Sequence, residues 1–217
     1  MSRQTGPLYG TIRTSLDYWP SYVDILTIVL MVFILQGFLQ TFINADYLEV
    51  IQLRESQEHL RAALGKEFHA EAEKGTINFT VSPNMLRIRF SEDILFERGR
   101  YDLAPAGAEI LRRCSRVLLL EGAPLYDQIE VEGHTDNARL EKQTYPHNNW
   151  ELSSARALTV VRQMIESGVE PKKLSANGYG EFQPIADNTD ALAQHRNRRI
   201  ELRIIFSASN SSSERAP

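Results

Sequence analysis

The sequence QIEVEGHTD, Gln128–Asp136, followed along the chain by LSSARALTVVRQMIESG, Leu152–Gly168, decides the fold. The first stretch alternates apolar and polar residues, which is typical of a strand, and it ends in a polar loop. The second has apolar residues at helical spacing and ends at Gly168, a residue type that commonly follows a helix. A strand followed by a helix of this length predicts one unit of an α/β domain.

The segments on either side repeat this alternation. The predicted strands are TINFTVS (76–82), MLRIRFS (85–91), LSANGYG (174–180) and RIELRIIF (199–206), and LAPAGAEILRRCSRVLLLEG (103–122) is a predicted helix. We therefore predict an α/β (α+β) domain over 76–206, in which helices cover a mixed sheet. The serine-rich end of the chain, 207–217, is predicted to be a disordered tail.

Length and composition limit the classes of function. The 217 residues, 42% of them hydrophobic, are enough for one globular domain and a further segment. A net charge of -4, with scattered Lys and Arg, excludes the basic surface that nucleic-acid binding requires. Cys114 is the only cysteine, so disulfides and cysteine metal sites are excluded, and its spacing from Leu111 and Leu118 predicts a buried helix face.

The further segment is apolar. ILTIVLMVFILQGFLQTFINA, Ile25–Ala45, has no charged residue and has about the 20 residues needed to cross a bilayer. A buried core helix is usually shorter, and a cleaved signal peptide has an apolar run of only about 7–15 residues. We predict an uncleaved membrane helix over 20–45. Arg3 and Arg13 precede it and mainly acidic residues follow, which favours a cytoplasmic N-terminal segment, 1–19.

Asp24 is the ionisable residue of this region. Pro20 is well placed to be the first helical residue, so Asp24 lies one turn inside the helix. Two interpretations remain open on physical grounds. Asp24 is either an interfacial anion stabilised by the helix dipole, or a carrier of protons or cations within the membrane.

Residues 46–75 are predicted to be a helical linker that ends at Gly75. Coiled-coil-like spacing relates Val50, Leu53, Leu60 and Leu64, with Gln57 in the seam. This pattern fits a short parallel dimer that continues the membrane helix. It fits equally an amphipathic helix that rests on the next domain.

Four ordered phrases of the chain resemble the C-terminal domain of the OmpA family. They are VEGHTD (131–136), NWELSSARA (149–157), GYGEFQPIADN (178–188) and NRRIEL (197–202), and the resemblance covers roughly 96–206. Domains of this family bind the diaminopimelate or equivalent group of the peptide stem of peptidoglycan. The resemblance therefore implies a periplasmic domain with a cell-wall ligand.

The resemblance also implies which residues hold that ligand. Asp136 occupies the aspartate position of the GHTD phrase, and Arg156 the arginine position of the LSxxRA phrase. A carboxylate can accept hydrogen bonds from the ligand ammonium, while a guanidinium binds the ligand carboxylate in a bidentate manner. Asn149, Asn197 and Arg198 are further candidates for the same peptidoglycan-binding site.

Each charged candidate has a structural alternative. Asp136 could cap a loop, Arg156 could pair with Glu151 on an exposed helix face, and Arg198 could be a solvated strand end. His134 has no nucleophile, acid–base partner or metal-ligand spacing around it in the sequence, so a packed or hydrogen-bonded histidine is expected. We predict no enzyme, no cofactor and no metal site.

A single N-terminal span joined to this domain is similar to the MotB family of flagellar stators. The similarity extends to SYVDILTIVLMVF, 21–33, in which Asp24 occupies the position of the ion-carrying aspartate. In such motors two B-type chains form a homodimer inside a ring of five multi-span A-type (MotA/ZorA-like) subunits. The resemblance implies these partners and an inner-membrane location, with the C-terminal domain in the periplasm.

Two departures make the chain more similar to ZorB, the corresponding component of Zorya anti-phage defence systems. A basic cytoplasmic tail is absent, and the predicted linker over 46–75 is short. The expected function is therefore that of a B-type stator subunit, with a defence motor favoured over motility. A passive tether between the inner membrane and the cell wall, without ion conduction, is the alternative from another class.

Overall fold

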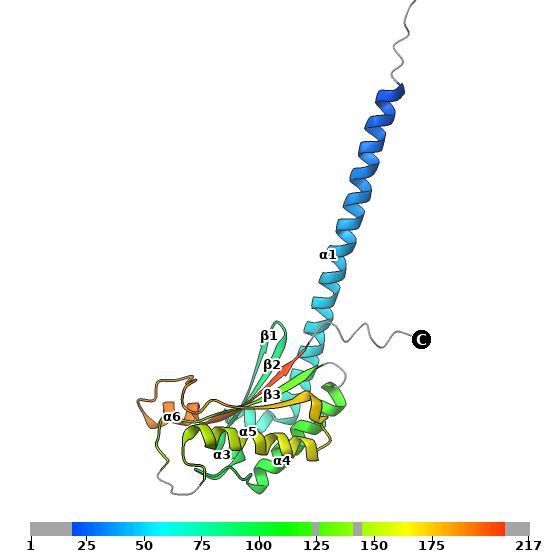
Figure 1. Cartoon of the computed structure of the whole chain (residues 1–217). Coiled ribbons are helices and arrows are strands. Elements are labelled where there is room, and N and C mark those ends of the chain that lie inside the picture. Colours follow the sequence, from blue (N-terminus) through cyan, green and yellow to red (C-terminus); the bar gives the residue numbers. More distant parts are fainter. Residues whose placement is uncertain (1–18, 123–125, 141–144, 207–217) are drawn as a thin grey trace, which may run out of the picture. The chain divides into compact units, whose positions relative to one another are not determined.

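A computed structural model describes residues 19–122, 126–140 and 145–206, with side chains described at 22–42 and from 51 onward (Figure 1). Residues 1–18 of the predicted cytoplasmic segment and the predicted tail, 207–217, lie outside the described residues. The chain divides into two compact units, Met1–Leu48 and Glu49–Pro217.

The first unit contains the beginning of α1, Trp19–Glu67. Within it Tyr22–Phe42 has a mean hydropathy of 2.2, and this segment is long and apolar enough to cross a membrane by length and composition. Every side chain of the segment is exposed in the isolated chain, as expected of a helix whose surroundings are lipid or other subunits. Asp24 lies near the start of α1, and the Thr27 hydroxyl donates to its backbone carbonyl at 2.8 Å.

The rest of α1 belongs to the second unit and is part of its core. Leu60 and Leu64 are fully buried, and Leu53 packs against the same cluster. Gln57 is also buried, and its side-chain amide bonds to the turn that joins the first two strands. The described residues of the predicted coiled-coil seam therefore pack against this chain's own domain. This agrees with the alternative of an amphipathic helix that rests on the next domain.

A guanidinium fixes the end of α1. Arg113 binds the Glu67 carboxylate through Nε at 2.7 Å and the Glu71 carboxylate through Nη1 at 2.8 Å, and its guanidinium lies over the Phe68 ring. Glu71 belongs to the short helix α2, His69–Glu73. Gly75 then turns the chain at a φ of 71°. The sequence-based boundary at Gly75 thus falls inside the compact unit, which begins at Glu49.

The described residues form a sheet of five strands in the order β1-β2-β5-β3-β4. The strands are β1 (Ile77–Ser82), β2 (Met85–Ser91), β3 (Gln128–His134), β4 (Leu174–Gly178) and β5 (Arg199–Ile205). Strands β3 and β4 are parallel, and the other neighbours are antiparallel. The predicted mixed sheet is confirmed.

After α1 and α2, the described residues of the second unit form the helices α3 (Glu92–Leu95), α4 (Pro105–Val117), α5 (Asn149–Glu166) and α6 (Ala191–Asn197), with short helical turns at Leu118–Gly122 and Pro171–Lys173. Pro105 opens α4, where its missing N–H costs nothing. Asn148 caps α5 by accepting from the Glu151 amide at 2.9 Å. The helices α3 and α6 were not predicted because they are too short to have a recognisable period.

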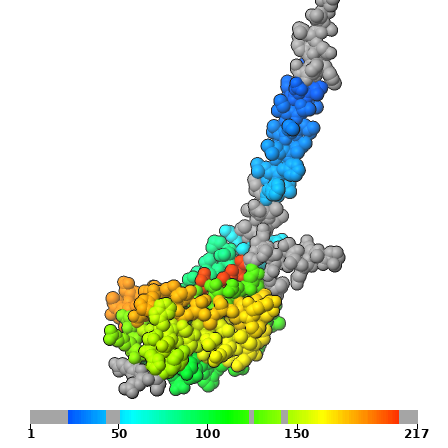
Figure 2. All heavy atoms as spheres, in the orientation of Figure 1, coloured from blue at the N-terminus to red at the C-terminus, as the bar shows by residue number. Residues whose placement is uncertain are grey.

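Alternation along the strands separates two faces of the sheet. One face is apolar, with Ile88, Val131 and Leu202 fully buried, and α4 and α5 lie against it (Figure 1). Cys114 of α4 is buried there as predicted, and burial raises the pKa of its thiol to about 12. The other face is polar and has arginines and glutamates in cross-strand contact. Figure 2 shows the α5 region (yellow-green) and the segment before β5 (orange) adjoining on one surface.

Candidate ligand-binding site

The candidate site lies where β3 ends and α5 begins. Gly133 stands at this end of β3, and a Cβ atom there would collide with the backbone carbonyl of Ser153 in α5. The loop after β3 is held by the Thr135 amide, which donates to the Gly180 carbonyl at 2.9 Å. Gly180 in turn donates its amide to the Ser153 hydroxyl at 2.9 Å. These contacts hold the end of β3, the start of α5 and the turn at Gly180 close together.

Four charged side chains meet there. Arg198 donates through Nη1 to Asp136 Oδ2 at 2.6 Å and pairs through Nε with Glu92 Oε2 at 3.0 Å. Arg156 pairs through Nη2 with the other oxygen of Glu92. All four line a hollow of about 140 Å³, which we call the charged hollow. The structure thus brings three of the candidate residues, Asp136, Arg156 and Arg198, together around one hollow.

Arg156 is the most enclosed of the four, with 1% of its surface exposed. Its Nε donates to the Arg100 carbonyl at 2.8 Å, and its guanidinium lies 5.2 Å from the centre of the Phe96 ring. Burial lowers the pKa of Arg156, and the nearby Glu92 carboxylate opposes that shift. The alternative pairing with Glu151 is absent from the described residues, because Glu151 belongs to the cap of α5.

Asp136 caps its loop with one carboxylate oxygen and pairs with an arginine through the other. Its Oδ1 accepts from the Ala138 amide at 3.1 Å, which caps the loop, and its Oδ2 faces Arg198. The Arg198 side chain is only 22% exposed, so it is not a freely solvated strand end. Each carboxylate of the charged hollow has a guanidinium partner, so the four side chains hold one another in place.

The two asparagines of the prediction differ. Asn149 lines the charged hollow, but its Nδ2 donates to the Asp136 carbonyl at 3.1 Å and to Glu181 Oε2 at 2.8 Å, so it positions two loops. Asn197 is fully buried, and both ends of its amide bond to the loop at 185–188. The structure does not bring Asn197 to the hollow.

Glu92 is the site residue that sequence reasoning missed. It follows β2 directly and holds Arg156 and Arg198 through its two oxygens. The only signal in the sequence was an acidic residue after a predicted strand, and this pattern is too common to indicate a site. Its place in the site depends on its contact with Arg156, which lies 64 positions further along the chain.

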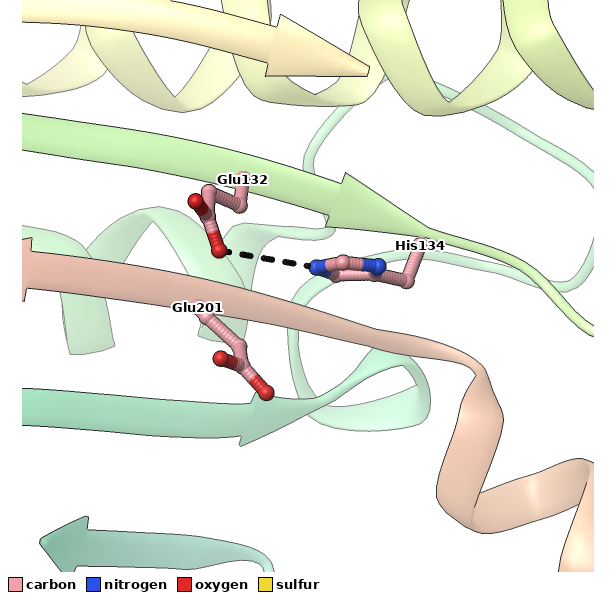
Figure 3. A group of neighbouring side chains, drawn as sticks. All are labelled: Glu132, His134 and Glu201. Carbon is pink, nitrogen blue, oxygen red and sulfur yellow. Dashed lines mark ion pairs between the residues drawn. The ribbon is translucent and has the colours of Figure 1, made fainter. Parts of the chain in front are cut away.

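A second cluster lies on the polar face of the sheet. Glu132, His134 and Glu201 place their potential ligand atoms within 4.8 Å of one another (Figure 3). Their carboxylates are already paired with guanidiniums, at 2.7–3.1 Å from Arg87, Arg89, Arg199 and Arg203. A metal ion would have to displace several of these cations, so we assign the cluster to the stability of the sheet.

His134 has a packing role. Its ring is 1% exposed and stacks on Tyr179, with the ring centres 5.3 Å apart and the planes at 18°. The nearest Glu132 oxygen is 3.8 Å away (Figure 3). Burial lowers the pKa of His134, which favours the neutral ring. This arrangement agrees with the prediction of a packed histidine.

The comparisons with known proteins fit this geometry. Residues 95–198 match the model of the OmpA family. This part of the chain is an OmpA-like domain. The chain is 31% identical over 121 residues to motility protein B of Bacillus subtilis, an alignment that covers 55% of this chain and 45% of the relative. The chain spans about half the length of the first curated relatives that it matches.

Solved structures agree with the fold of the OmpA-like domain. A putative MotB-like protein from Desulfovibrio vulgaris has a TM-score of 0.62 and 26% identity, over 72% of this chain and 99% of that chain. The cell wall anchor of the type VI secretion system from Pseudomonas aeruginosa has a TM-score of 0.60 over 66% of this chain and 97% of that chain. At 24% identity the latter supports the fold alone.

The resemblance to MotB-like proteins with an OmpA-like domain is therefore confirmed, as is the fold class. Relatives with a descriptive name include motility protein B and outer membrane protein A, which are not enzymes, in agreement with the predicted non-enzymatic role. One N-terminal apolar helix and an OmpA-like domain fit a single-pass inner-membrane protein.

Proposed function

We propose that this chain is a B-type stator subunit of an ion-driven motor and anchors that motor to peptidoglycan. The observation that carries the proposal is the charged hollow, in which Glu92 joins Arg156 to Arg198 and Arg198 pairs with Asp136. A diaminopimelate group has an ammonium and a carboxylate on one carbon. The carboxylates of the hollow suit the ammonium, and the guanidiniums suit the carboxylate.

The second part of the proposal concerns Asp24. It lies at the beginning of the apolar segment Tyr22–Phe42, in a helix that has no other acidic residue up to Phe42. An ionisable group in a membrane helix is costly unless it is paired or hydrated, so its presence favours a functional role. We assign to Asp24 the transient binding of protons or sodium ions during transport.

A stator requires partners. We propose a MotA/ZorA-like multi-span subunit, in five copies around two copies of this chain, and peptidoglycan as the fixed support. The N-terminus is placed in the cytoplasm and the OmpA-like domain in the periplasm. Similarity to motility protein B supports this assembly.

We further propose that the motor is of the Zorya defence type. Leu53 already packs on the globular unit, about three helical turns after Phe42, so little chain remains for a flexible linker. A flagellar stator is the alternative supported by the relatives, and a passive wall tether is the alternative without ion conduction.

The test separates the two parts of the function. Asp24→Asn should abolish motor output, measured as phage resistance or motility of the host, while the protein remains inserted and sediments with purified peptidoglycan. Asp136→Ala and Arg156→Ala should lose sedimentation, and Glu166→Gln, a change at an exposed position, is the control. If the Asp24→Asn protein kept full phage resistance or motility and still bound the wall, the ion-carrying role of Asp24 would be wrong. The passive wall tether would then be the remaining function.

A further inference from the structure

A second pocket lies at the end of the sheet where β1 begins and β2 ends. It has a volume of about 170 Å³, and we call it the basic pocket. Its lining includes His195 and four arginines, which are Arg89, Arg196, Arg198 and Arg199. None of the described residues that line it is acidic. A concave surface with one sign of charge attracts ions of the opposite sign.

Strand pairing fixes one wall of the basic pocket. Arg89 of β2 lies opposite Glu201 of β5, and Ser91 at the end of β2 lies opposite Arg199. The Ser91 amide donates to the Thr76 carbonyl at 2.9 Å, which holds the segment before β1 against the end of β2. The arginines of this wall therefore stand on a rigid sheet and not on a loop.

The end of α6 forms the opposite wall. Asn197, the last residue of α6, is fully buried, and its Oδ1 accepts from the Ile185 amide at 2.9 Å. Ile185 also lines the basic pocket, so Asn197 holds α6 and this loop together. On the same wall His195 Nε2 is 3.3 Å from the Ser91 hydroxyl. This contact joins α6 to β2 and places Arg196 at the edge of the pocket.

The arginines on the sheet share one carboxylate. Glu201 is buried, and its two oxygens lie 2.7 Å from Arg199 Nε, 3.0 Å from Arg89 Nε and 3.1 Å from Arg87 Nε. A single negative charge therefore faces three guanidiniums. This leaves an excess of positive charge on the sheet side of the basic pocket.

The remaining cations differ in their partners. Arg196 is exposed, and no ion pair holds it within the described part of the chain. Arg198 is shared with the charged hollow, where it pairs with the acids of that site. Asp93 faces His195, with its Oδ2 3.5 Å from Nε2. Arg196 therefore adds to the uncompensated charge, whereas Arg198 does not.

We propose that the basic pocket binds a phosphate group. Phosphate is compact, and its oxygens accept charge-assisted hydrogen bonds from several guanidiniums at once. A carboxylate has only two oxygens and is satisfied by one guanidinium. The volume is below the range of about 300–1,000 Å³ for drug-sized ligands, which suits a single small anionic group.

This inference goes beyond the proposed wall anchor and does not rest on it. A phosphate group has two sources here, a dissolved phosphate ester and the headgroup of a phospholipid. Both present the same oxygens to the guanidiniums, so the experiment uses separate probes for them.

The experiment is calorimetric titration of the full-length chain in neutral maltoside micelles at pH 7 and constant ionic strength. We expect inorganic phosphate to bind saturably and acetate to bind at least about tenfold more weakly, because it forms fewer charge-assisted hydrogen bonds. The phosphate titration is then repeated in micelles that contain phosphatidylglycerol or an equal amount of a fatty carboxylate. Weaker phosphate binding with the phospholipid alone identifies a headgroup as the occupant, and equal binding in both identifies a dissolved ester.

Two arginines of β2 give a matched pair of variants. Arg87 and Arg89 both pair with Glu201, and their side chains are 33% and 30% exposed, but only Arg89 lines the basic pocket. Arg89→Gln should weaken phosphate binding about tenfold through the loss of charge-assisted hydrogen bonds. Arg87→Gln should leave the affinity for phosphate unchanged.

Arg196→Gln tests the pocket at an exposed position where folding is not at risk. It should also weaken phosphate binding, whereas Arg112→Gln, at an exposed arginine of α4, should not. Peptidoglycan sedimentation should be normal in all four variants. The phosphate site is wrong if phosphate does not bind, if acetate binds equally well, or if Arg87→Gln weakens binding as much as Arg89→Gln. Each of these results would leave the wall-anchor function standing.

Discussion

Arg198 donates to Asp136 across 2.6 Å, and this contact joins the start of β5 to the loop after β3. The same guanidinium reaches Glu92 with its Nε, so a single side chain links both acids of the charged hollow. Opposite charges that are already paired keep the hollow ordered without a ligand. A zwitterionic ligand can then replace these contacts with equivalent ones of its own.

Glu92 should be essential to this arrangement. In Glu92→Gln the buried Arg156 loses its counter-charge, and breaking a buried ion pair costs about 3–5 kcal/mol. Urea unfolding of the full chain in micelles measures the loss. Glu97→Gln, whose side chain is 74% exposed, should change stability by less than about 0.5 kcal/mol. Equal stability of the two variants would contradict the structural role of Glu92.

Two glycines should respond in opposite directions to the same substitution. Gly133→Ala drives a methyl group into the Ser153 carbonyl, and we expect a loss of about 1–3 kcal/mol together with weaker wall binding. Gly65→Ala lies inside α1 with open space around it, and we expect a gain of about 0.5–1 kcal/mol. Thermal unfolding compares them. A stable Gly133→Ala protein would show that α5 can move away from β3.

His134 should make stability depend on pH. Its pKa in the folded chain lies below the ordinary value of 6.5, so the folded state favours the neutral ring. This contribution is complete above pH 6.5 and is lost as the pH falls, because the unfolded chain then binds the proton more readily. The loss is at most about 1.4 kcal/mol per pH unit.

The pKa values of Glu132 and Glu201 are lowered by their arginine and histidine partners against the effect of burial, so their contribution is lost only below about pH 4.5. The interval from pH 6.5 to 5 therefore reports on His134. His134→Gln should flatten the dependence of the unfolding free energy on pH in that interval. An unchanged pH dependence in His134→Gln would contradict this assignment.

The end of α1 should behave as core. Leu64→Ala removes a fully buried side chain, and we expect a loss of about 2–5 kcal/mol. This loss should not vary with protein concentration, because Leu64 packs within its own chain. A loss that grows on dilution would instead assign Leu64 to a dimer seam.

Local pattern was enough for much of the fold. Alternation identified all five strands, and helical spacing identified α4 with Cys114 on its buried face. It failed at α3 and α6, which are shorter than two helical turns and so have no measurable period. The spacing of Leu60 and Leu64 likewise showed that this face of α1 is buried, but it could not identify the surface that buries it.

The candidate site, like the fold, could be predicted only in part from the sequence. The ordered phrases of the sequence named Asp136, Arg156 and Arg198 as candidates, because each phrase is a local string of residues that resembles the family's own. Only the tertiary structure showed that Glu92 lies between the two arginines and that Asn197 lies outside the hollow. It also showed that Trp150 stacks on Phe182. These relationships join residues that are distant in the chain. The register of the strands and the close approach of α5 to Gly133 bring these residues together. Both depend on contacts between segments, so the sequence of one segment cannot predict them.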